Sequence, residues 1–298
     1  MSEPSTSTTP AGAIHDIGYR HYDGPRLGAS YIRRSLFVET LRGAYGLGRS
    51  TRSKVMPLLL LAVMVLPAVV IGIVTSYIGL SSLPLGYTEY VVTVQVAVTV
   101  FLGSQSPAVM SRDLRFRVAA LYFSRPLSRQ QYVQAKYAGM AAALFVLTGL
   151  PITLLLAGAL LAELPLGEQL PDYLRAMGGA VLYALVLAAV GLVVAAMTPR
   201  RGLGVAAVVG VLLVLSGLQV TVRAMADEFG NDTFSGYTGL ISPYTLVDGV
   251  VAGVLGAESS IGQGPPAAMG AAVFSAVVVL LVVGAYATLV ARYRKALS

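Results

Sequence analysis

The sequence predicts an all-α integral membrane protein with six transmembrane helices, an amphipathic amino-terminal interface helix and a short helix in a cytoplasmic loop. Composition is the first indication: 56% of the 298 residues are hydrophobic and 12% are charged, a charged fraction about half that of a typical soluble domain. The other two indications are the number of long apolar stretches and the distribution of basic residues between them. Together they exclude a soluble globular fold.

Six stretches are long and apolar enough to cross a bilayer. A spanning helix needs about 20 mainly apolar residues to cross a hydrocarbon core of roughly 30 Å. The candidates are residues 55–79, 89–110, 138–162, 174–198, 203–223 and 267–291. Between the fourth and fifth, Pro199 and Gly202 break the helix and Arg200 and Arg201 resist burial, which predicts a tight helical hairpin. Gly and Pro also occur inside the apolar runs, as membrane helices tolerate.

The basic residues indicate an orientation. Lys and Arg collect in residues 1–54, in the loop between spans two and three, in the hairpin at Arg200 and in the carboxyl-terminal tail, which leaves only Arg175 and Arg223 for the other side. Acidic residues favour that other side: Glu89, Glu163, Glu168, Asp172, Asp227, Glu228, Asp232, Asp248 and Glu258. Because basic loops stay in the cytoplasm, both termini are predicted to be cytoplasmic. The positive charge then faces one side of a membrane, and no nucleic-acid partner is expected.

Two regions precede the first span. The Ser-, Thr- and Pro-rich start predicts a flexible cytoplasmic region over residues 1–29. Apolar residues then recur every three or four positions with three arginines among them, which predicts an amphipathic helix lying flat in the interface over 30–54. The stripe is Ile32, Leu36, Phe37, Leu41, Ala44 and Tyr45. A plain membrane anchor is the alternative. Residues 55–298 form the six-helix transmembrane domain.

The cytoplasmic loop over residues 111–137 is too structured for a simple tether. Leu114, Val118, Leu121 and Tyr122 form a short apolar stripe, and Pro126 ends that helix. Ser128 and Gln131 have the spacing of a capping box that begins the next helix. The loop therefore predicts a docking surface for another protein, and a merely solvated basic loop is the alternative.

The outer loop over residues 224–266 is also long. It begins with an acidic, turn-rich run, passes Ser242-Pro243-Tyr244 and continues as TLVDGVVAGVLG. That last segment is apolar but too short to span, so a re-entrant or interfacial helix is expected. Gly249 and Gly253 have the GxxxG spacing that allows close packing against a neighbouring helix.

Several kinds of chemistry are absent from the sequence. There is no GxxxxGK[ST] phosphate loop, so the chain does not hydrolyse ATP by that route. No HExxH, GxSxG or His–carboxylate cluster occurs, the two histidines lie in the polar start, and there are no cysteines to form disulfides. No charged residue falls clearly at mid-depth of a span, which argues against an ion relay. A transporter built this way needs an outside energy source.

Mild polar character runs through two spans. Gln95, Thr99 and Ser106 share one face of span two beside Gln105, and Ser216, Gln219 and Arg223 recur at helical spacing in span five. Such groups normally point away from lipid. We take Gln95, Thr99, Ser106 and Gln219 as candidates for a translocation pathway. Hydrogen bonding between helices alone is the alternative.

The architecture resembles the permease subunit of a bacterial type-2 ATP-binding-cassette (ABC) exporter. The resemblance covers nearly the whole chain. It is closest from Asp113 to Lys136, where an acidic residue, an apolar helix and the turn SRPLSR at 124–129 resemble the coupling region of that family. The segment SPYTLVDG at 242–249 resembles the start of its outer re-entrant helices, and YRHYDGPR at 19–26 is similar to a bacterial branch of such permeases.

The resemblance implies a half-transporter subunit in a bacterial plasma membrane. Two permease subunits would pair, as a homodimer or a heterodimer, and each would dock the helix at 112–123 into a separate cytoplasmic ATPase. That partner would bind ATP and Mg, so this chain would bind no cofactor and would not be an enzyme by itself. The implied coupling residues are Arg112, Asp113, Arg115, Arg117, Leu121, Tyr122 and Arg125.

Two other functions stay open at this point. A membrane enzyme acting on lipid would need an interfacial carboxylate, His or metal cluster, for which Asp16, Asp23, Glu39 and Asp113 are too scattered. A channel or assembly subunit is the other, and a channel would conduct without nucleotide.

Overall fold

The chain is all-helical over the described residues. The computed structural model describes residues 24, 27–111, 113, 127–198, 200–262 and 264–295, and this part of the chain contains no strand. In chain order the elements are α1 (Ala29–Ala44), α2 (Thr51–Ile78), α3 (Tyr87–Thr93), α4 (Gln95–Ser106), the π-helix η1 (Pro107–Ser111), α7 (Arg129–Leu161), α8 (Leu166–Met197), α9 (Arg201–Glu228), α10 (Asp232–Tyr237), the 3₁₀ helix η2 (Thr238–Leu240), α11 (Pro243–Leu255) and α12 (Ala267–Lys295).

Five described helices are individually long and apolar enough to cross a membrane: α2, α7, α8, α9 and α12. Two further segments pass the same test only as bent pairs. The break between α3 and α4 bends the chain by 59°, and the turn between η2 and α11 bends it by 117°. Five to seven crossings are therefore compatible with the structure, and the predicted six lies within that range. The predicted span 89–110 is a broken helix and not a straight one.

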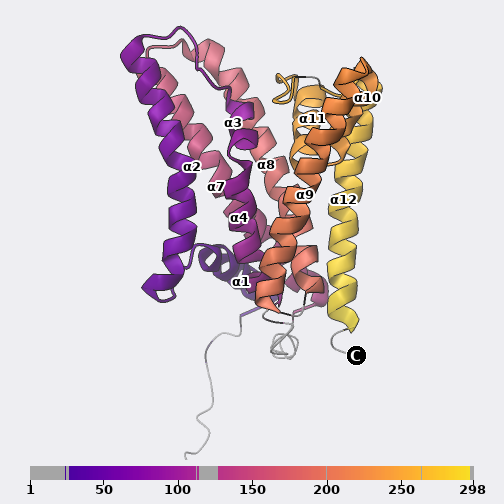
Figure 1. Ribbon diagram of the computed structural model, residues 1–298. Helices are drawn as coiled ribbons and strands as arrows, with labels where there is room; N and C mark the ends of the chain where they lie inside the picture. The colour runs from indigo at the N-terminus through magenta and orange to yellow at the C-terminus, as the bar shows by residue number, and fades with distance from the viewer. Residues whose placement is uncertain are drawn as a thin grey trace, which may run out of the picture.

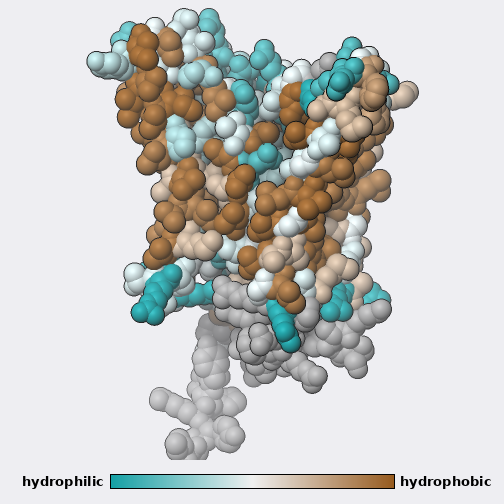
Figure 2. Space-filling view, viewed as in Figure 1, coloured by the Kyte–Doolittle hydropathy of each residue, from teal (hydrophilic) through white to brown (hydrophobic). Residues whose placement is uncertain are grey.

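The helices form a bundle with polar ends and an apolar middle (Figures 1 and 2). One end carries α1, the α8–α9 turn and the end of α12. Its exposed basic residues include Arg33, Arg34, Arg42, Arg200 and Arg294, and we call it the basic end. The opposite end carries the start of α3, the start of α8 and α10. Its acidic residues include Glu89, Glu168, Asp172 and Asp232, and we call it the acidic end.

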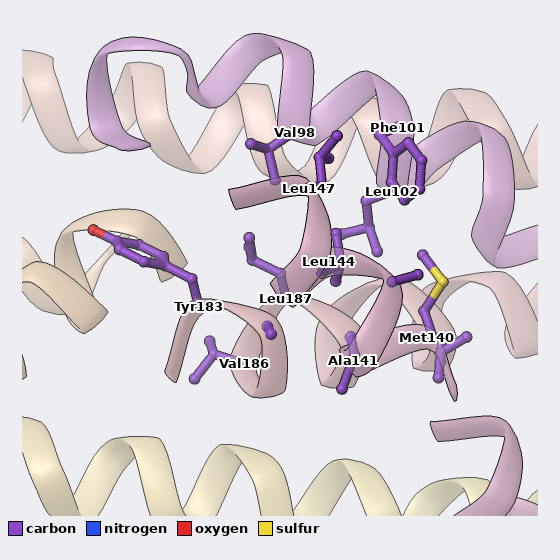
Figure 3. Packing of buried hydrophobic residues seen from close by; sticks show 14 of the residues in the cluster. Val98, Phe101, Leu102, Met140, Ala141, Leu144, Leu147, Tyr183, Val186 and Leu187 are labelled. Atoms are coloured by element: carbon purple, nitrogen blue, oxygen red, sulfur yellow. The ribbon is translucent and has the colours of Figure 1, made fainter. Parts of the chain in front are cut away.

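Helices α7 and α8 occupy the centre of the bundle. In their most apolar stretches 50% and 61% of the residues are buried, whereas the values are 22% for α2 and 17% each for α9 and α12. Side chains of α4, α7 and α8 interlock in the interior, among them Phe101, Leu144 and Leu187 (Figure 3). The peripheral helices leave broad apolar faces exposed, which is the arrangement that lipid or a second membrane subunit can cover.

Small residues allow the helices to approach closely. A Cβ atom added to Gly249 would lie 2.3 Å from the ring of Phe274, and one added to Gly253 would lie 2.7 Å from the Cβ of Ala271. Both neighbours belong to α12, so the predicted close packing of the GxxxG pair is confirmed. Lipid tails are as apolar as the side chains, so the hydrophobic effect does not hold the helices together within the bilayer. Close van der Waals packing between the helices does.

The structure confirms the predicted capping box and the predicted helical hairpin. Ser128 begins α7 as a capping box: its Oγ accepts from Gln131 N at 3.2 Å, and its own N donates to Gln131 Oε1 at 3.0 Å. Helix α8 ends at Met197 and α9 begins at Arg201, as the hairpin prediction requires. Four prolines lie inside long helices: Pro57, Pro67, Pro151 and Pro171.

A helix is present where the interface helix was expected, but it ends earlier. Helix α1 stops at Ala44, and the chain turns through Gly46, whose φ of +66° and contact with the Ser53 backbone exclude a larger residue. Leu36, Thr40 and Ala44 are buried on one side of α1. Beyond the helix, Tyr45 donates to the Ala143 carbonyl at 2.7 Å, and burial raises the pKa of its phenol well above the usual range. That α1 lies in a membrane interface stays a prediction.

Candidate functional site

The two helix breaks meet inside the bundle. The α3–α4 break falls at Val94, and the turn before α11 falls at Ile241 and Ser242. Tyr244, in the first turn of α11, connects them: its hydroxyl lies 2.7 Å from Thr99 Oγ1 and 3.1 Å from the carbonyl oxygen of Gln95. Because Tyr244 donates to the Gln95 carbonyl, its oxygen is left to accept from Thr99. We call this contact the break junction.

Two further hydrogen bonds hold the turn before α11. Tyr183 of α8 donates to the carbonyl of Tyr244 at 3.2 Å, and Ser216 of α9 lies 3.1 Å from Ser242, oxygen to oxygen. Tyr183 and Tyr244 also place their rings 6.2 Å apart. A helix break frees backbone groups that lipid cannot satisfy, so such breaks persist only where protein or a water-filled cavity surrounds them. Here α4, α8 and α9 supply the partners.

The four predicted pathway residues lie on two helices. Gln95 and Thr99 both belong to the break junction, Gln95 through its backbone and Thr99 through its side chain. Ser106 is the last residue of α4 and is buried, lying close to Gly191 of α8. Gln219 is buried on α9, one turn beyond Ser216. The structure thus brings two of the four together and places the other two elsewhere along α4 and α9.

Three buried polar atoms in the described part of the chain lack a hydrogen-bond partner. They are Ser106 Oγ, Gln219 Nε2 and one terminal nitrogen of Arg223. Arg223 is held by Asp227, whose carboxylate lies 3.5 Å from its Nε. A buried donor without a partner costs about 1 to 3 kcal/mol. Gln219 and Arg223 lie one turn apart on α9, so that helix carries two such groups on one face.

The sequence does not predict the role of Tyr244, the most connected residue of the site. Tyr244 lies within the SPYTLVDG segment, and Tyr183 belongs to none of the motifs described above. Neither carries a local signal for its role, because their partners lie 61 to 149 residues away along the chain. The one available signal was Ser242-Pro243, since proline is favoured in the first turn of a helix and marks where α11 begins.

A polar pocket of about 890 Å³ opens at the acidic end. Its walls come from the start of α3, the first turns of α8 and the α11–α12 connection, and the surface is hollowed at this end (Figure 2). Glu89, Asp172 and Glu258 line it together with Arg175. Arg175 binds Asp172 at 2.7 Å and the Leu255 carbonyl at 3.0 Å. The pocket is therefore anionic. Arg175 joins α8 to the end of α11, and Tyr87 of α3 donates to Gln169 of α8 at 2.8 Å.

The α11–α12 connection is fastened by one buried carboxylate. Asp248 is 1% exposed, and its oxygens accept from Ser259 Oγ at 2.8 Å, from Ser260 N at 3.1 Å and from Ser260 Oγ at 2.5 Å. Since Asp248 lies on α11 and the serines line the pocket, these hydrogen bonds link the pocket wall to α11.

A second buried cluster lies near the basic end, at the start of the predicted coupling loop. Lys136 Nζ lies 3.0 Å from Asp113 Oδ2, and Tyr132 donates to the same oxygen at 2.5 Å. The ring of Tyr293 of α12 packs against that of Tyr132 at a tilt of 54°, with centroids 5.1 Å apart, and its hydroxyl contacts Met110. Asp113 is thus not an exposed docking charge. It is neutralised inside the chain and joins the start of the loop to α7 and α12.

The other predicted coupling residues lie outside the described residues. They are Arg112, Arg115, Arg117, Leu121, Tyr122 and Arg125. Among the residues that the structure covers, no group of three His, Cys, Asp or Glu side chains could hold a metal ion.

Comparison with known proteins adds no family assignment. No protein-family model matches the chain, and no curated protein matches it either.

Proposed function

We propose that this chain is the transmembrane permease subunit of an ABC transporter, of the exporting kind. It forms the translocation pathway, and a separate cytoplasmic ATPase subunit that binds ATP and Mg supplies the energy. A second permease subunit completes the pathway. The complex lies in a bacterial plasma membrane with both termini of this chain in the cytoplasm.

The break junction is the observation that carries the proposal. Secondary transporters place their sites where discontinuous helices meet inside the membrane, and irregular backbone at that depth is tolerated only where it is buried in protein or lines a water-filled cavity. We extend this reasoning to a permease driven by a separate ATPase. In this chain the α3–α4 break and the turn before α11 meet through Tyr244, Gln95 and Thr99. A protein that served only as an anchor would have no need of two broken helices facing each other.

The surroundings of the junction agree with a pathway shared between two subunits. Gln219 and Arg223 leave buried nitrogens without partners on α9, a helix with a largely exposed apolar stretch. A bound water or a rearrangement during transport would satisfy these buried nitrogens, and a second subunit would cover the exposed apolar face of α9. The anionic pocket at the acidic end lies on the side to which an exporter releases its substrate.

The cluster around Asp113 supplies a route for coupling. Asp113 lies at the start of the predicted docking loop, and its partners Lys136 and Tyr132 begin α7. Tyr132 contacts Tyr293 near the end of α12. A displacement of the loop by an ATPase would therefore move α7 and α12 together, because a buried ion pair resists separation.

The decisive experiment is purification of the tagged chain from its native membrane in a mild detergent. We expect an ABC-type ATPase to copurify, and the chain purified alone to hydrolyse no ATP. The reconstituted complex should lose substrate-stimulated hydrolysis when Leu121 and Tyr122 are replaced by Asp. Hydrolysis by the chain alone, or ion conductance of the chain in a planar bilayer without nucleotide, would contradict the proposal.

A further inference from the structure

A groove with two arginines lies between α1 and α7 near the basic end. It has a volume of about 530 Å³ and is lined by Ser30, Arg33, Arg34, Phe37, Gln134, Ala135 and Ala138. Neither the pathway nor the Asp113 cluster uses these residues. The groove forms beside the point where α1 and α7 cross.

Helices α1 and α7 touch most closely at Thr40 and Gly139. A Cβ atom on Gly139 would lie 2.7 Å from the Cβ of Thr40 and 3.0 Å from the Phe37 carbonyl oxygen. The residues that line the groove precede this crossing on both helices, and Ala135 and Ala138 contribute only small side chains to it. The groove is thus a built feature of the fold.

The lining selects for an anion attached to an apolar chain. Arg33 and Arg34 are exposed. Among the described residues, no carboxylate lines the groove and neither arginine forms an ion pair. Guanidinium groups match phosphate oxygens in pairs, and Ser30 and Gln134 add hydrogen-bond donors. Phe37 and the two alanines form an apolar floor beside these polar groups.

The groove lies at the level where α7 changes from polar to apolar. Its residues Gln134 to Ala138 follow the polar first turns of α7 and precede the apolar stretch that continues to Leu161. Phospholipid headgroups occupy that level in a membrane, and basic pockets on the cytoplasmic side attract anionic lipids.

We propose that this groove binds the phosphate headgroup of an anionic phospholipid, with Arg33 and Arg34 on the phosphate and one acyl chain along Phe37. The inference does not depend on the transport proposal, because it requires only a chain embedded in a bilayer. It gives α1 a specific role as the helix that fixes the bundle against the anionic face of the membrane.

The test compares lipid retention by variants of the purified chain. Micelles containing dioleoyl phosphatidylglycerol or dioleoyl phosphatidylcholine are added, and bound lipid is counted by native mass spectrometry. We expect the unmodified chain to prefer phosphatidylglycerol by roughly tenfold or more, and Arg33→Gln/Arg34→Gln to lose that preference. Phe37→Ala should weaken retention without changing the headgroup preference.

A charge-matched double variant is the control. Arg42 and Arg294 are exposed at the same end but do not line the groove, so Arg42→Gln/Arg294→Gln should keep the preference. Equal loss in both double variants would show general charge attraction and overturn the proposal. Displacement of the lipid by millimolar inorganic phosphate would show that the groove binds a free anion, and it would overturn the lipid assignment. Unchanged lipid retention together with loss of a copurifying protein would assign the groove to a protein partner instead.

Discussion

The hydroxyl of Tyr244 and the hydroxyl of Thr99 lie 2.7 Å apart although 145 residues separate them in the chain. Thr99 lies in the first turns of α4, just after one helix break, and Tyr244 lies just after the other. Their contact makes the two breaks one structural unit, and the first prediction concerns its strength.

Replacement of Tyr244 by Phe should destabilise the chain and leave its fold intact. The ring still packs against Tyr183, but Thr99 and the Gln95 carbonyl lose their partner, which typically costs about 1 to 3 kcal/mol for buried groups. Thr99→Val removes only one of the two bonds and should cost less. Thermal unfolding of both single variants and the double variant gives a coupling energy, for which about 0.6 kcal/mol is typical within membranes. Strict additivity would mean that the two hydroxyls do not interact.

The long elements were predictable because their signals are local. Apolar length locates α2, α7, α8, α9 and α12, although α7 begins at Arg129 and α8 at Leu166, well before the predicted starts at 138 and 174. Ser128 with Gln131 marks the start of α7. Pro67 and Pro151 lie inside predicted spans and do not end their helices, since membrane helices tolerate proline. These features depend on residues within one or two turns of each other.

The site was only partly predictable because its cause is tertiary. The segment around Val94 contains no Gly or Pro, and its break is accommodated by Tyr244 from another part of the chain. Tyr87, Tyr90 and Tyr293 lie near the ends of long apolar stretches, yet all three are buried. Several donate to backbone carbonyls of other helices, as Tyr90 does to Met64 and Tyr137 to Leu185. A hydropathy pattern cannot distinguish a tyrosine facing headgroups from one that joins two helices.

Removal of Lys136 should be more damaging than removal of any exposed basic residue. Lys136→Met leaves the buried Asp113 carboxylate without its cation, and breaking a buried pair from one side costs about 3 to 5 kcal/mol. The double variant Lys136→Met/Asp113→Asn should recover much of this loss, since no uncompensated charge remains. Arg129→Met, an exposed position on the same helix, serves as the control and should change the unfolding temperature little. A single variant as stable as that control would mean that the ion pair does not form.

Close packing of α2 on α7 depends on a reciprocal pair of glycines. A Cβ on Gly72 would lie 2.8 Å from the Cα of Gly158, and a Cβ on Gly158 would lie 2.6 Å from the Cα of Gly72. Because the obstruction is backbone, Gly158→Leu must push the helices apart, with a cost of at least about 1 to 3 kcal/mol. Gly284→Leu is the matched control, since nothing lies within 4 Å of a Cβ there. Unfolding temperatures in detergent should fall for Gly158→Leu alone, and an equal fall in both variants would contradict the contact.

The predicted orientation can be tested directly because the chain contains no cysteine, so each introduced thiol is unique. Ser50 is exposed in the turn between α1 and α2 at the basic end, and Ser81 is exposed in the connection between α2 and α3 at the opposite end. Basic loops remain on the cytoplasmic side, so a membrane-impermeant maleimide added to intact cells should label Ser81→Cys and not Ser50→Cys. After permeabilisation both should react to the same extent, which controls for accessibility of the thiols. Labelling of Ser50→Cys alone in intact cells would invert the orientation, and the anionic pocket beside Glu89 and Asp172 would then open to the cytoplasm, where an exporter takes up its substrate instead of releasing it.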